Sequence, residues 1–419
     1  MRWRLRSLLR ELGPGIITGA SDDDPSGIAT YSQIGAQFGA GPLWFALATL
    51  PGMIAVQEMC ARIAIVTRKG LIANIRTFFP AWFVWVIVLL LAFANVINIG
   101  ADLGMMAASA QLLFPLPFWS WLSLFTLLTL ALQIFVPYER YAKYLKWLTL
   151  FLFSYVLVAF ASNIQWREAF WSTLHPTFEW TREYLFIAIA FIGTTISPYL
   201  YVWQANCELE TETVRSHVSM LKALPMATRI RDSRIDVISG MTLSNVIAWF
   251  VILTAANVLH ANGITYINTA DEAARVLAPL AGPFASTIFA LGIIGTGLLA
   301  VPVLSSVVAY ACAEVSSQKG SLGGTWMEEK FFYGIIVVTT LLGVVVNIAG
   351  VNPIQLLIYS AVANAVIAPP LLFAIFRIAE SKERLKQWTN PWWVQVAGFV
   401  TLVVMTVASV VGIWLTVTG

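Results

Sequence analysis

The sequence is poor in charge and in the motifs that carry catalysis or cofactor binding. Only 11% of its 419 residues are charged, against about 25% in an average soluble domain. Its three cysteines, Cys60, Cys207 and Cys312, are far apart and follow no CxxC or Cys/His spacing, which argues against a disulfide framework or a zinc site. Glycine-rich phosphate loops, HExxH runs and GxSxG elbows are missing. We therefore expect neither an enzyme nor a bound cofactor.

Hydrophobic residues, by contrast, make up 58% of the chain. They gather in segments that reach the length of about 20 apolar residues needed to cross a bilayer. The sequence predicts eleven such helices, at residues 13–40, 42–66, 80–112, 117–136, 144–162, 184–207, 236–260, 283–313, 330–350, 353–377 and 392–417. This pattern predicts an all-α polytopic membrane protein. The pI of about 8.7 does not indicate nucleic-acid binding, because the basic residues lie beside hydrophobic segments.

The distribution of Lys and Arg predicts the orientation of these segments. If the N-terminus is cytoplasmic, 21 of the 25 Lys and Arg residues fall in cytoplasmic segments and three fall outside. Such a bias follows the positive-inside rule. We therefore expect residues 1–12 to be cytoplasmic and the chain to be a multi-pass protein of a bacterial inner membrane. The lipid bilayer is an expected partner, and no obligatory protein partner is evident.

The segment Gly13–Ala40 carries an unusual cluster at its centre. Three consecutive carboxylates are followed by Pro25, Ser26 and Gly27; they are Asp22, Asp23 and Asp24. Charges are unfavourable at bilayer depth, and Pro and Gly both weaken a helix. We therefore predict that this helix is interrupted at the carboxylates. Asp24 followed by Pro25 also fits a helix N-cap with Pro at the first helical position.

A second interruption is predicted in residues 184–207. Pro198 has no amide to donate, so the Thr194 carbonyl would lack its usual helical partner. The two interrupted helices occupy corresponding positions in two five-helix halves, residues 13–162 and 184–377, which would cross the membrane in opposite senses. Paired interruptions of this kind are typical of the substrate site of a secondary transporter.

The residue types at these breaks favour a cation. Unwound backbone exposes carbonyl oxygens, and carboxylates add charge and oxygen, the donor set of a hard divalent ion. Three adjacent carboxylates cannot all be ionised at low cost in a low dielectric without a cation nearby.

Several stretches resemble the NRAMP (natural resistance-associated macrophage protein) family of divalent metal transporters. The run GPGIITGASDDDPSGIATYSQIG is similar to the family's first helix, whose signature is DPGN, and GTTISPY is similar to its sixth-helix motif Ala-x-x-Met-Pro-His. QEMCARIAIVTRKG and ADLG resemble parts of its second and third helices. The resemblance implies a leucine-transporter-type fold with a 5+5 inverted repeat, a core at residues 13–377, and a cytoplasmic linker with an eleventh helix at 378–419.

The departures from the family pattern concern the metal ligands. Gly27 occupies the position of the family's Asn, Ser197 that of its Met, and Thr194 that of an Ala whose carbonyl binds metal. A thioether favours softer transition metals, and a hydroxyl does not. The resemblance therefore implies the NRAMP-related branch associated with Mg²⁺, with Mn²⁺ also accepted. The predicted metal ligands are Asp22, Asp23, Asp24, Gly27, Thr194 and Ser197.

The same comparison implies weak proton coupling or none. Asp102 matches the family's Asp, but Met105 stands where the family has an acidic residue one turn on, and residues 330–350 contain no Arg. Tyr199 replaces the family's His after the proline. Asp102, Tyr199 and Asn364 are expected to line the ion path or to take part in coupling.

Other interpretations compete with the Mg²⁺ transporter. A proton-coupled Mn²⁺ or Fe²⁺ importer differs in its metal and its coupling. A cation-coupled amino-acid carrier of the same fold would hold a substrate carboxylate, which three aspartates would repel. An intramembrane aspartyl protease would need paired aspartates such as Asp24 and Asp102. A passive channel would differ in turnover rate.

Overall fold

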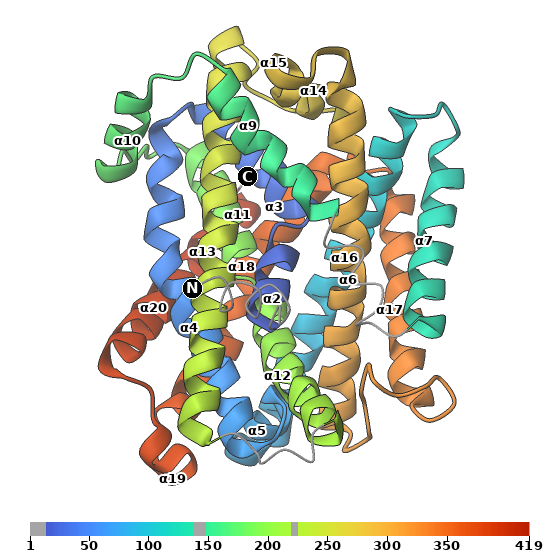
Figure 1. Ribbon diagram of the computed structural model, residues 1–419, viewed down its shortest axis with the longest axis vertical. Helices are drawn as coiled ribbons and strands as arrows, with labels where there is room; N and C mark the ends of the chain where they lie inside the picture. The colour runs from blue at the N-terminus through green and yellow to red at the C-terminus, as the bar shows by residue number, and fades with distance from the viewer. Residues whose placement is uncertain (1–13, 137–147, 219–224, 419) are drawn as a thin grey trace.

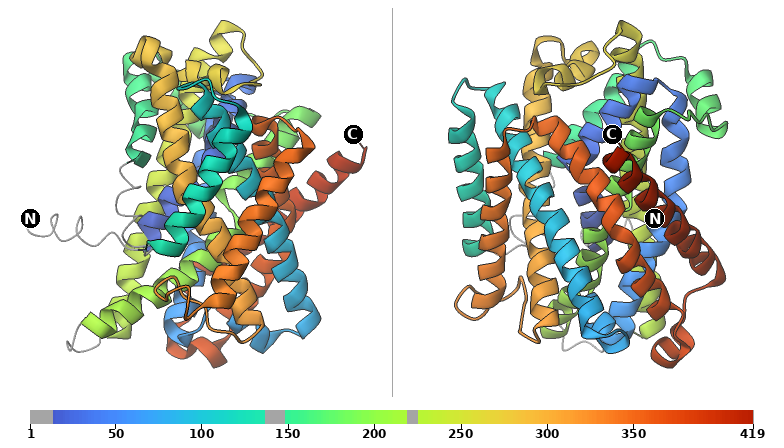
Figure 2. Two further views of the ribbon diagram at one scale, coloured as in Figure 1. Left: turned by 90° about the vertical axis from the view of Figure 1, so that its right-hand side faces the viewer. Right: turned by 180° about the vertical axis from the view of Figure 1, so that it is seen from behind.

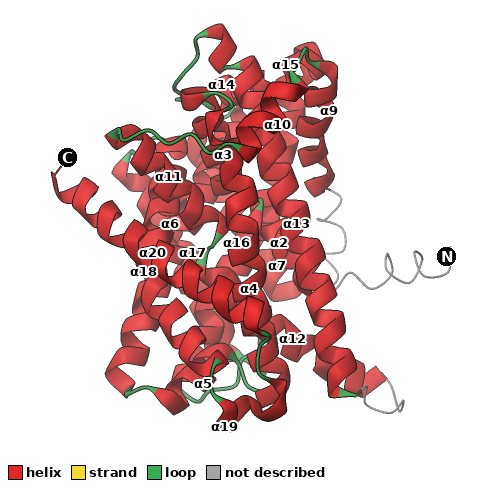
Figure 3. Ribbon diagram, turned by 90° about the vertical axis from the view of Figure 1, so that its left-hand side faces the viewer, coloured by secondary structure: helices red, strands yellow, loops and turns green. Residues whose placement is uncertain are grey.

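The structure, a computed structural model, describes residues 14–136, 148–218 and 225–418. These residues form a bundle of helices without β-strands, in which most of the long helices run along the long axis of the molecule (Figures 1 and 3). Within the described residues, nine helices are long and apolar enough to cross a membrane. Eight of them centre on α4 (Trp44–Thr67), α6 (Ala81–Gln111), α7 (Phe118–Phe135), α13 (Met226–Val258), α16 (Ala285–Val315), α17 (Lys330–Val346), α18 (Pro353–Ala379) and α20 (Trp392–Thr418).

The ninth is the predicted sixth helix, and it is interrupted as expected. It consists of α11 (Arg182–Thr195) and α12 (Pro198–Val218), with the break at Ile196 and Ser197. The predicted first helix is likewise divided into α2 (Pro14–Asp22) and α3 (Pro25–Phe38). The predicted fifth helix is described only from residue 148, as a 3₁₀ turn (Leu148–Leu152) followed by α9 (Phe153–Ala161). Both predicted interruptions are therefore confirmed.

The two interrupted helices lie in the interior of the bundle. α11 packs against α18 and α3, and α12 packs against α4, α16 and α2. In contrast, α7 and α20 carry large exposed apolar side chains, among them Leu127 and Val410, and they lie at the periphery (Figure 1). An apolar face that other helices do not cover is expected to contact lipid in a membrane protein. The fold thus places both helix breaks away from lipid.

Helix α13 supports both halves of the first interrupted helix. A Cβ on Gly19 of α2 would lie 2.4 Å from the Gly240 carbonyl, and a Cβ on Gly35 of α3 would lie 2.4 Å from the Ile252 carbonyl. Neither glycine could be replaced without moving α13, since both contacts are with backbone. The backbone of α13 therefore sets the positions of α2 and α3 together.

The polar stretch between the predicted membrane helices at residues 184–207 and 236–260 is not one long loop where the structure describes it. Helix α12 continues to Val218 and α13 begins at Met226, so much of this polar stretch is helical. Hydropathy detects only the part of a helix that lies in lipid, and these helices extend beyond it. Two further short helices, α14 (Ala270–Ala274) and α15 (Ala278–Ala281), lie between the predicted membrane helices at residues 236–260 and 283–313. The sequence did not predict three short helices, α5 (Leu71–Phe78), α10 (Trp166–Leu174) and α19 (Lys382–Leu385).

Candidate metal site at the two helix breaks

Asp24 caps the second half of the first interrupted helix. It has extended backbone (φ −72°, ψ 173°), and its Oδ1 accepts hydrogen bonds from the Gly27 amide at 2.8 Å and the Ser26 hydroxyl at 2.7 Å. Pro25 occupies the first turn, where its missing N–H costs nothing. The Asp24 side chain thus has the predicted N-cap geometry, which leaves Oδ2 available to other groups.

Asp24 Oδ2 is contacted from the second interrupted helix. The Tyr199 hydroxyl lies 3.2 Å from this oxygen and 3.3 Å from the Ser21 carbonyl. The Ser26 hydroxyl lies 3.2 Å from that of Thr194, with either oxygen able to donate. The two helix breaks therefore meet, and they bring the predicted residues Asp24, Thr194 and Tyr199 together.

Asp22 and Asp23 face a different helix. The Ser244 hydroxyl of α13 lies 2.7 Å from Oδ2 of Asp22 and 3.1 Å from Oδ1 of Asp23. A hydroxyl has one hydrogen, so it can satisfy only one carboxylate at a time. Oδ1 of Asp22 has no hydrogen-bond partner among the described residues, although the side chain is fully buried. Both carboxylates therefore retain capacity to bind a cation.

Sequence reasoning missed Ser244. It lies one turn after Gly240, the residue that contacts α2 at Gly19. The small residues Gly240, Ser244 and Ala248 recur at every fourth position on α13, a spacing typical of a close helix–helix contact. That spacing could have placed Ser244 next to the first interrupted helix.

The second break does not leave the Thr194 carbonyl free, which corrects the prediction. The Ser197 hydroxyl lies 2.7 Å from the Thr194 carbonyl and 2.9 Å from the Gly193 carbonyl. The Tyr201 hydroxyl donates to the Ile196 carbonyl at 2.7 Å. Side-chain hydroxyls thus replace the amide that Pro198 lacks. A carbonyl has a second lone pair, so Thr194 can still contribute an oxygen to a cation.

Gly27 supplies no side chain to the site. A Cβ at this position would lie 3.1 Å from the Asp22 carbonyl and 3.3 Å from the ring of Tyr31. Tyr31 is fully buried, and its hydroxyl has no hydrogen-bond partner among the described residues. It interacts electrostatically with all three aspartates. Tyr31 is therefore a further oxygen at the site, in a place that the sequence did not indicate.

Asp102 and Asn364 are buried near the site without partners. Asp102 of α6 interacts electrostatically with Asp24, and neither of its carboxylate oxygens has a hydrogen-bond partner among the described residues. The Asn364 amide of α18 is likewise unpaired within that part of the chain. The amides of Asn95 and Asn98 on α6 are also buried without a hydrogen-bond partner among the described residues.

The carboxylates do not converge on one point. Within the described residues, no three His, Cys, Asp or Glu side chains lie close enough together to hold a metal ion. A cation here would need hydroxyls, carbonyls or water to complete its coordination. This donor set contains oxygen only, as hard divalent ions prefer, and Mg²⁺ in particular keeps several of its waters.

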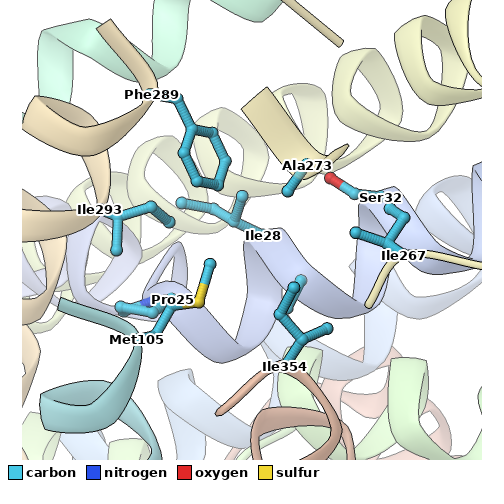
Figure 4. Close-up of a pocket in the computed structure, with 10 residues that line it drawn as sticks. Pro25, Ile28, Ser32, Met105, Ile267, Ala273, Phe289, Ile293 and Ile354 are labelled. Atoms are coloured by element: carbon cyan, nitrogen blue, oxygen red, sulfur yellow. The ribbon is translucent and has the colours of Figure 1, made fainter. Parts of the chain in front are cut away.

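The side chains at the two helix breaks are buried. Asp22, Asp23, Asp24, Thr194 and Ser197 are each at most 1% exposed. A small pocket adjoins Pro25 on the α3 side, between α3, α6, α16 and α18 (Figure 4). Its wall is almost wholly apolar and includes Ile28, Met105, Phe289 and Ile354. An apolar wall of this kind offers no ligand to a cation, so the pocket itself adds nothing to the oxygen donors at the helix breaks.

The chain is similar to several known proteins in sequence and in fold. The divalent metal cation transporter MntH of Klebsiella pneumoniae (strain 342) is 28% identical over 422 residues, which cover 97% of this chain and 93% of the relative. A crystal structure of the Eremococcus coleocola manganese transporter has a TM-score of 0.78 at 18% identity and covers 97% of this chain and 86% of that chain. An inward-facing structure of Mhp1 has a TM-score of 0.54 at 12% identity, with 97% and 92% covered.

These similarities confirm the predicted leucine-transporter-type fold. The relatives are named as transporters, in agreement with the expectation that the chain is not an enzyme. A family model described as natural resistance-associated macrophage protein-like matches residues 15–415. Since that match spans both helix breaks and nearly all of the sequence, the chain belongs to the natural resistance-associated macrophage protein-like family.

Proposed function

We propose that this protein is a secondary transporter that moves divalent metal cations across the membrane by alternating access, with Mg²⁺ favoured and Mn²⁺ also carried. The observation that supports this most directly is the meeting of the two breaks, where Asp24 contacts Tyr199 and Ser26 contacts Thr194. Broken helices that meet inside a membrane bundle are typical of transporter substrate sites.

The preference for Mg²⁺ rests on the chemistry of the ligands. The side chains at both breaks offer carboxylate and hydroxyl oxygens, and the position of the family's Met is Ser197. The Ser197 hydroxyl donates to its own helix, so it adds no soft donor. Oxygen-only sites favour Mg²⁺ over softer metals, while Mn²⁺ accepts the same ligands. The manganese transport named for the Eremococcus coleocola protein supports Mn²⁺ as a second substrate.

We further propose that transport has weak proton coupling or none. Asp102 forms no ion pair with any described residue, and the ion pairs that the structure records elsewhere involve Glu58, Asp232 and Asp271. A proton relay needs titratable side chains in sequence. The membrane potential, negative inside, would then drive the cation inward with about 2.3 kcal/mol per charge per 100 mV.

Uptake into proteoliposomes tests the metal and the coupling together. Fluorescent indicators inside the vesicles would report Mg²⁺, Mn²⁺ or Ca²⁺ entry and internal pH under an imposed membrane potential. We expect Mg²⁺ and Mn²⁺ to enter and to compete, Asp24→Ala to abolish both, and internal pH to stay constant. Saturable Mn²⁺ entry without any Mg²⁺ entry or competition would contradict the metal preference.

A proton-coupled Mn²⁺ or Fe²⁺ importer is the second candidate. The electrostatic interaction between Asp102 and Asp24 favours it, because a carboxylate next to the substrate ligand could carry a proton. Acidification of the vesicle interior during Mn²⁺ entry, lost in Asp102→Asn, would establish this alternative.

We also propose that the chain lies in a bacterial inner membrane with its N-terminus in the cytoplasm. The bias of Lys and Arg supports this orientation. Fusion of reporter proteins that are active on only one side of the membrane to either terminus would test it. Activity of a periplasmic reporter at the N-terminus would refute the proposal.

A further inference from the structure

One face of α6 carries buried polar side chains that the site described above does not explain. Asn95, Asn98 and Asp102 follow a spacing of three and four residues, so they lie on the same side of the helix. Each is 0% exposed. Within the described residues, no nitrogen or oxygen of these three side chains has a hydrogen-bond partner. Buried amides without partners are rare and unfavourable. We therefore expect a polar group to lie against this face of α6.

Asn364 of α18 is a fourth buried amide in the interior of the bundle. Two residues further on, the Val366 carbonyl accepts a hydrogen bond from Ser409 of α20, which fixes the side of α18 that contacts α20. Residues two apart on a helix point about 200° apart, so Asn364 lies on the side away from α20. Helix α18 also packs against α6. Asn364 is 0% exposed, and its amide is unpaired among the described residues.

The depth of Asn364 matches that of the α6 amides. Helices α6 and α18 lie side by side in opposite directions (Figure 2, right). Met105 of α6 and Ile354 of α18 line the same pocket (Figure 4). Asn95 precedes Met105 by ten residues and Asn364 follows Ile354 by ten, a rise of about 15 Å along each helix. The Asn95 and Asn364 side chains are therefore at about the same level.

These four side chains, Asn95, Asn98, Asp102 and Asn364, form what we term the amide column. One end is Asp102, which lies one turn of α6 before Met105, and Met105 lines the same pocket as Pro25, the residue after Asp24. Beyond the other end α6 continues with buried Leu91 and Val88, which are apolar and close the column. The column is thus continuous with the proposed metal site and extends from it along α6.

We infer that the amide column binds a divalent cation together with its water shell, at a second site distinct from the one at Asp24. Three neutral amides and one carboxylate carry too little charge to strip water from Mg²⁺, which dehydrates reluctantly. Amide oxygens accept hydrogen bonds from coordinated water, and Asp102 supplies the attraction for the positive charge. Asn side chains do not titrate, so the column suits a hydrated ion rather than a proton. This inference rests on the proposed function.

Hexaamminecobalt(III) provides a probe for such a site, because its ammonia ligands do not exchange and it resembles hydrated Mg²⁺ in size. We would measure Mg²⁺ uptake into proteoliposomes with the probe on both sides of the bilayer. Asn98→Leu and Asn95→Leu keep the side-chain size and remove the polar atoms. We expect each to lower uptake about tenfold, as loss of outer ligands does, and to relieve inhibition by the probe. The affinity of these variants for Mn²⁺ at Asp24, measured by calorimetry, should remain within about twofold of the wild-type value.

A variant expected to strengthen inhibition by the probe complements the two Leu variants, which are expected to weaken it. Asn98→Asp adds a negative charge that attracts the cationic probe, so the probe should inhibit uptake at a concentration about fivefold lower. Thr126→Val is the matched control, since Thr126 is buried on the neighbouring α7 and its hydroxyl bonds to the Leu122 carbonyl of its own helix at 2.7 Å. It should transport and respond to the probe as the wild type does.

The outcomes distinguish a failure of the amide-column inference from a failure of the proposed function. If Asp24→Ala leaves uptake unchanged, the proposed function fails. If uptake depends on Asp24 but both Leu variants transport and are inhibited as the wild type is, the column inference is overturned. If the Leu variants cannot be purified as folded protein, Asn98→Asp decides, because an unchanged response to the probe would equally overturn it.

Discussion

The two helix breaks look alike in sequence and differ in how their polar groups are used. At the first break the side chains turn outward to other helices, Asp22 and Asp23 to Ser244 of α13 and Asp24 to Tyr199 of α12. At the second break Thr194 and Tyr199 contact the first break, whereas the Ser197 hydroxyl lies against the carbonyls of its own helix. The first break therefore carries the charge available to a ligand, whereas the second is largely satisfied by itself. Substitutions should affect transport at the first and stability at the second.

The largest effect is expected from Asp24→Asn. The substitution removes the charge while keeping a side chain that can cap α3, so the fold should persist. Loss of an outer partner costs about 10–100-fold in metal affinity, and loss of a direct ligand should cost more. We expect Mg²⁺ uptake to fall by more than about 100-fold. The exposed Asp271→Asn on α14 is the control, and equal rates in the two variants would contradict the role of Asp24.

A smaller effect is expected from Ser244→Ala on α13. A hydrogen bond to a charged group contributes about 1.5–3 kcal/mol, so uptake should fall about tenfold or more. Ser239→Ala on the same helix is the matched control, because Ser239 is exposed and its hydroxyl bonds to the Ile235 carbonyl. Proteoliposome uptake rates would provide the measurement. A wild-type rate in Ser244→Ala would show that Asp22 and Asp23 are positioned by other contacts.

Tyr199→Phe tests the contact that joins the two breaks. It removes one hydroxyl, 3.2 Å from Asp24, and leaves the ring packing intact. One hydrogen bond to a carboxylate in a buried site contributes about 1.5–3 kcal/mol at most, and the longer distance places this bond at the lower end. We expect about a tenfold rise in the Mg²⁺ concentration for half-maximal uptake. An unchanged value would indicate that the two breaks act independently.

The smallest effect on transport is expected from Ser197→Ala. The Thr194 and Gly193 carbonyls would lose a hydroxyl donor in a buried place, at a cost of about 1 kcal/mol. Thermal unfolding in detergent should therefore begin about one degree lower, while the uptake rate should stay within about twofold. A large loss of uptake without a thermal shift would mean that the Ser197 oxygen is itself a ligand.

The sequence was sufficient to predict the membrane helices and both interruptions, because hydropathy, Pro and adjacent carboxylates act locally. It was not sufficient where contacts join distant segments. Ser244 lies more than 220 residues from Asp22, and the spacing of small residues on α13 indicates a close helix contact without identifying the partner helix. The closure of the Thr194 carbonyl by Ser197 depends on a side-chain rotamer, which composition does not reveal. The extensions of α12 and α13 beyond the membrane were missed because their surfaces are polar.

The contacts of α13 with α2 and α3 have a mechanical consequence. Gly19 lies against the backbone of Gly240, and Gly35 lies against the Ile252 carbonyl with the Ala255 methyl group beside it. Neither half of the first helix can tilt away from α13 without opening such a contact, whereas a displacement along the axis of α13 would preserve it. Helix α13 therefore restricts the direction in which α2 and α3 can move. This restriction depends on Gly19 and Gly35, each of which has a hydrogen atom in place of a side chain.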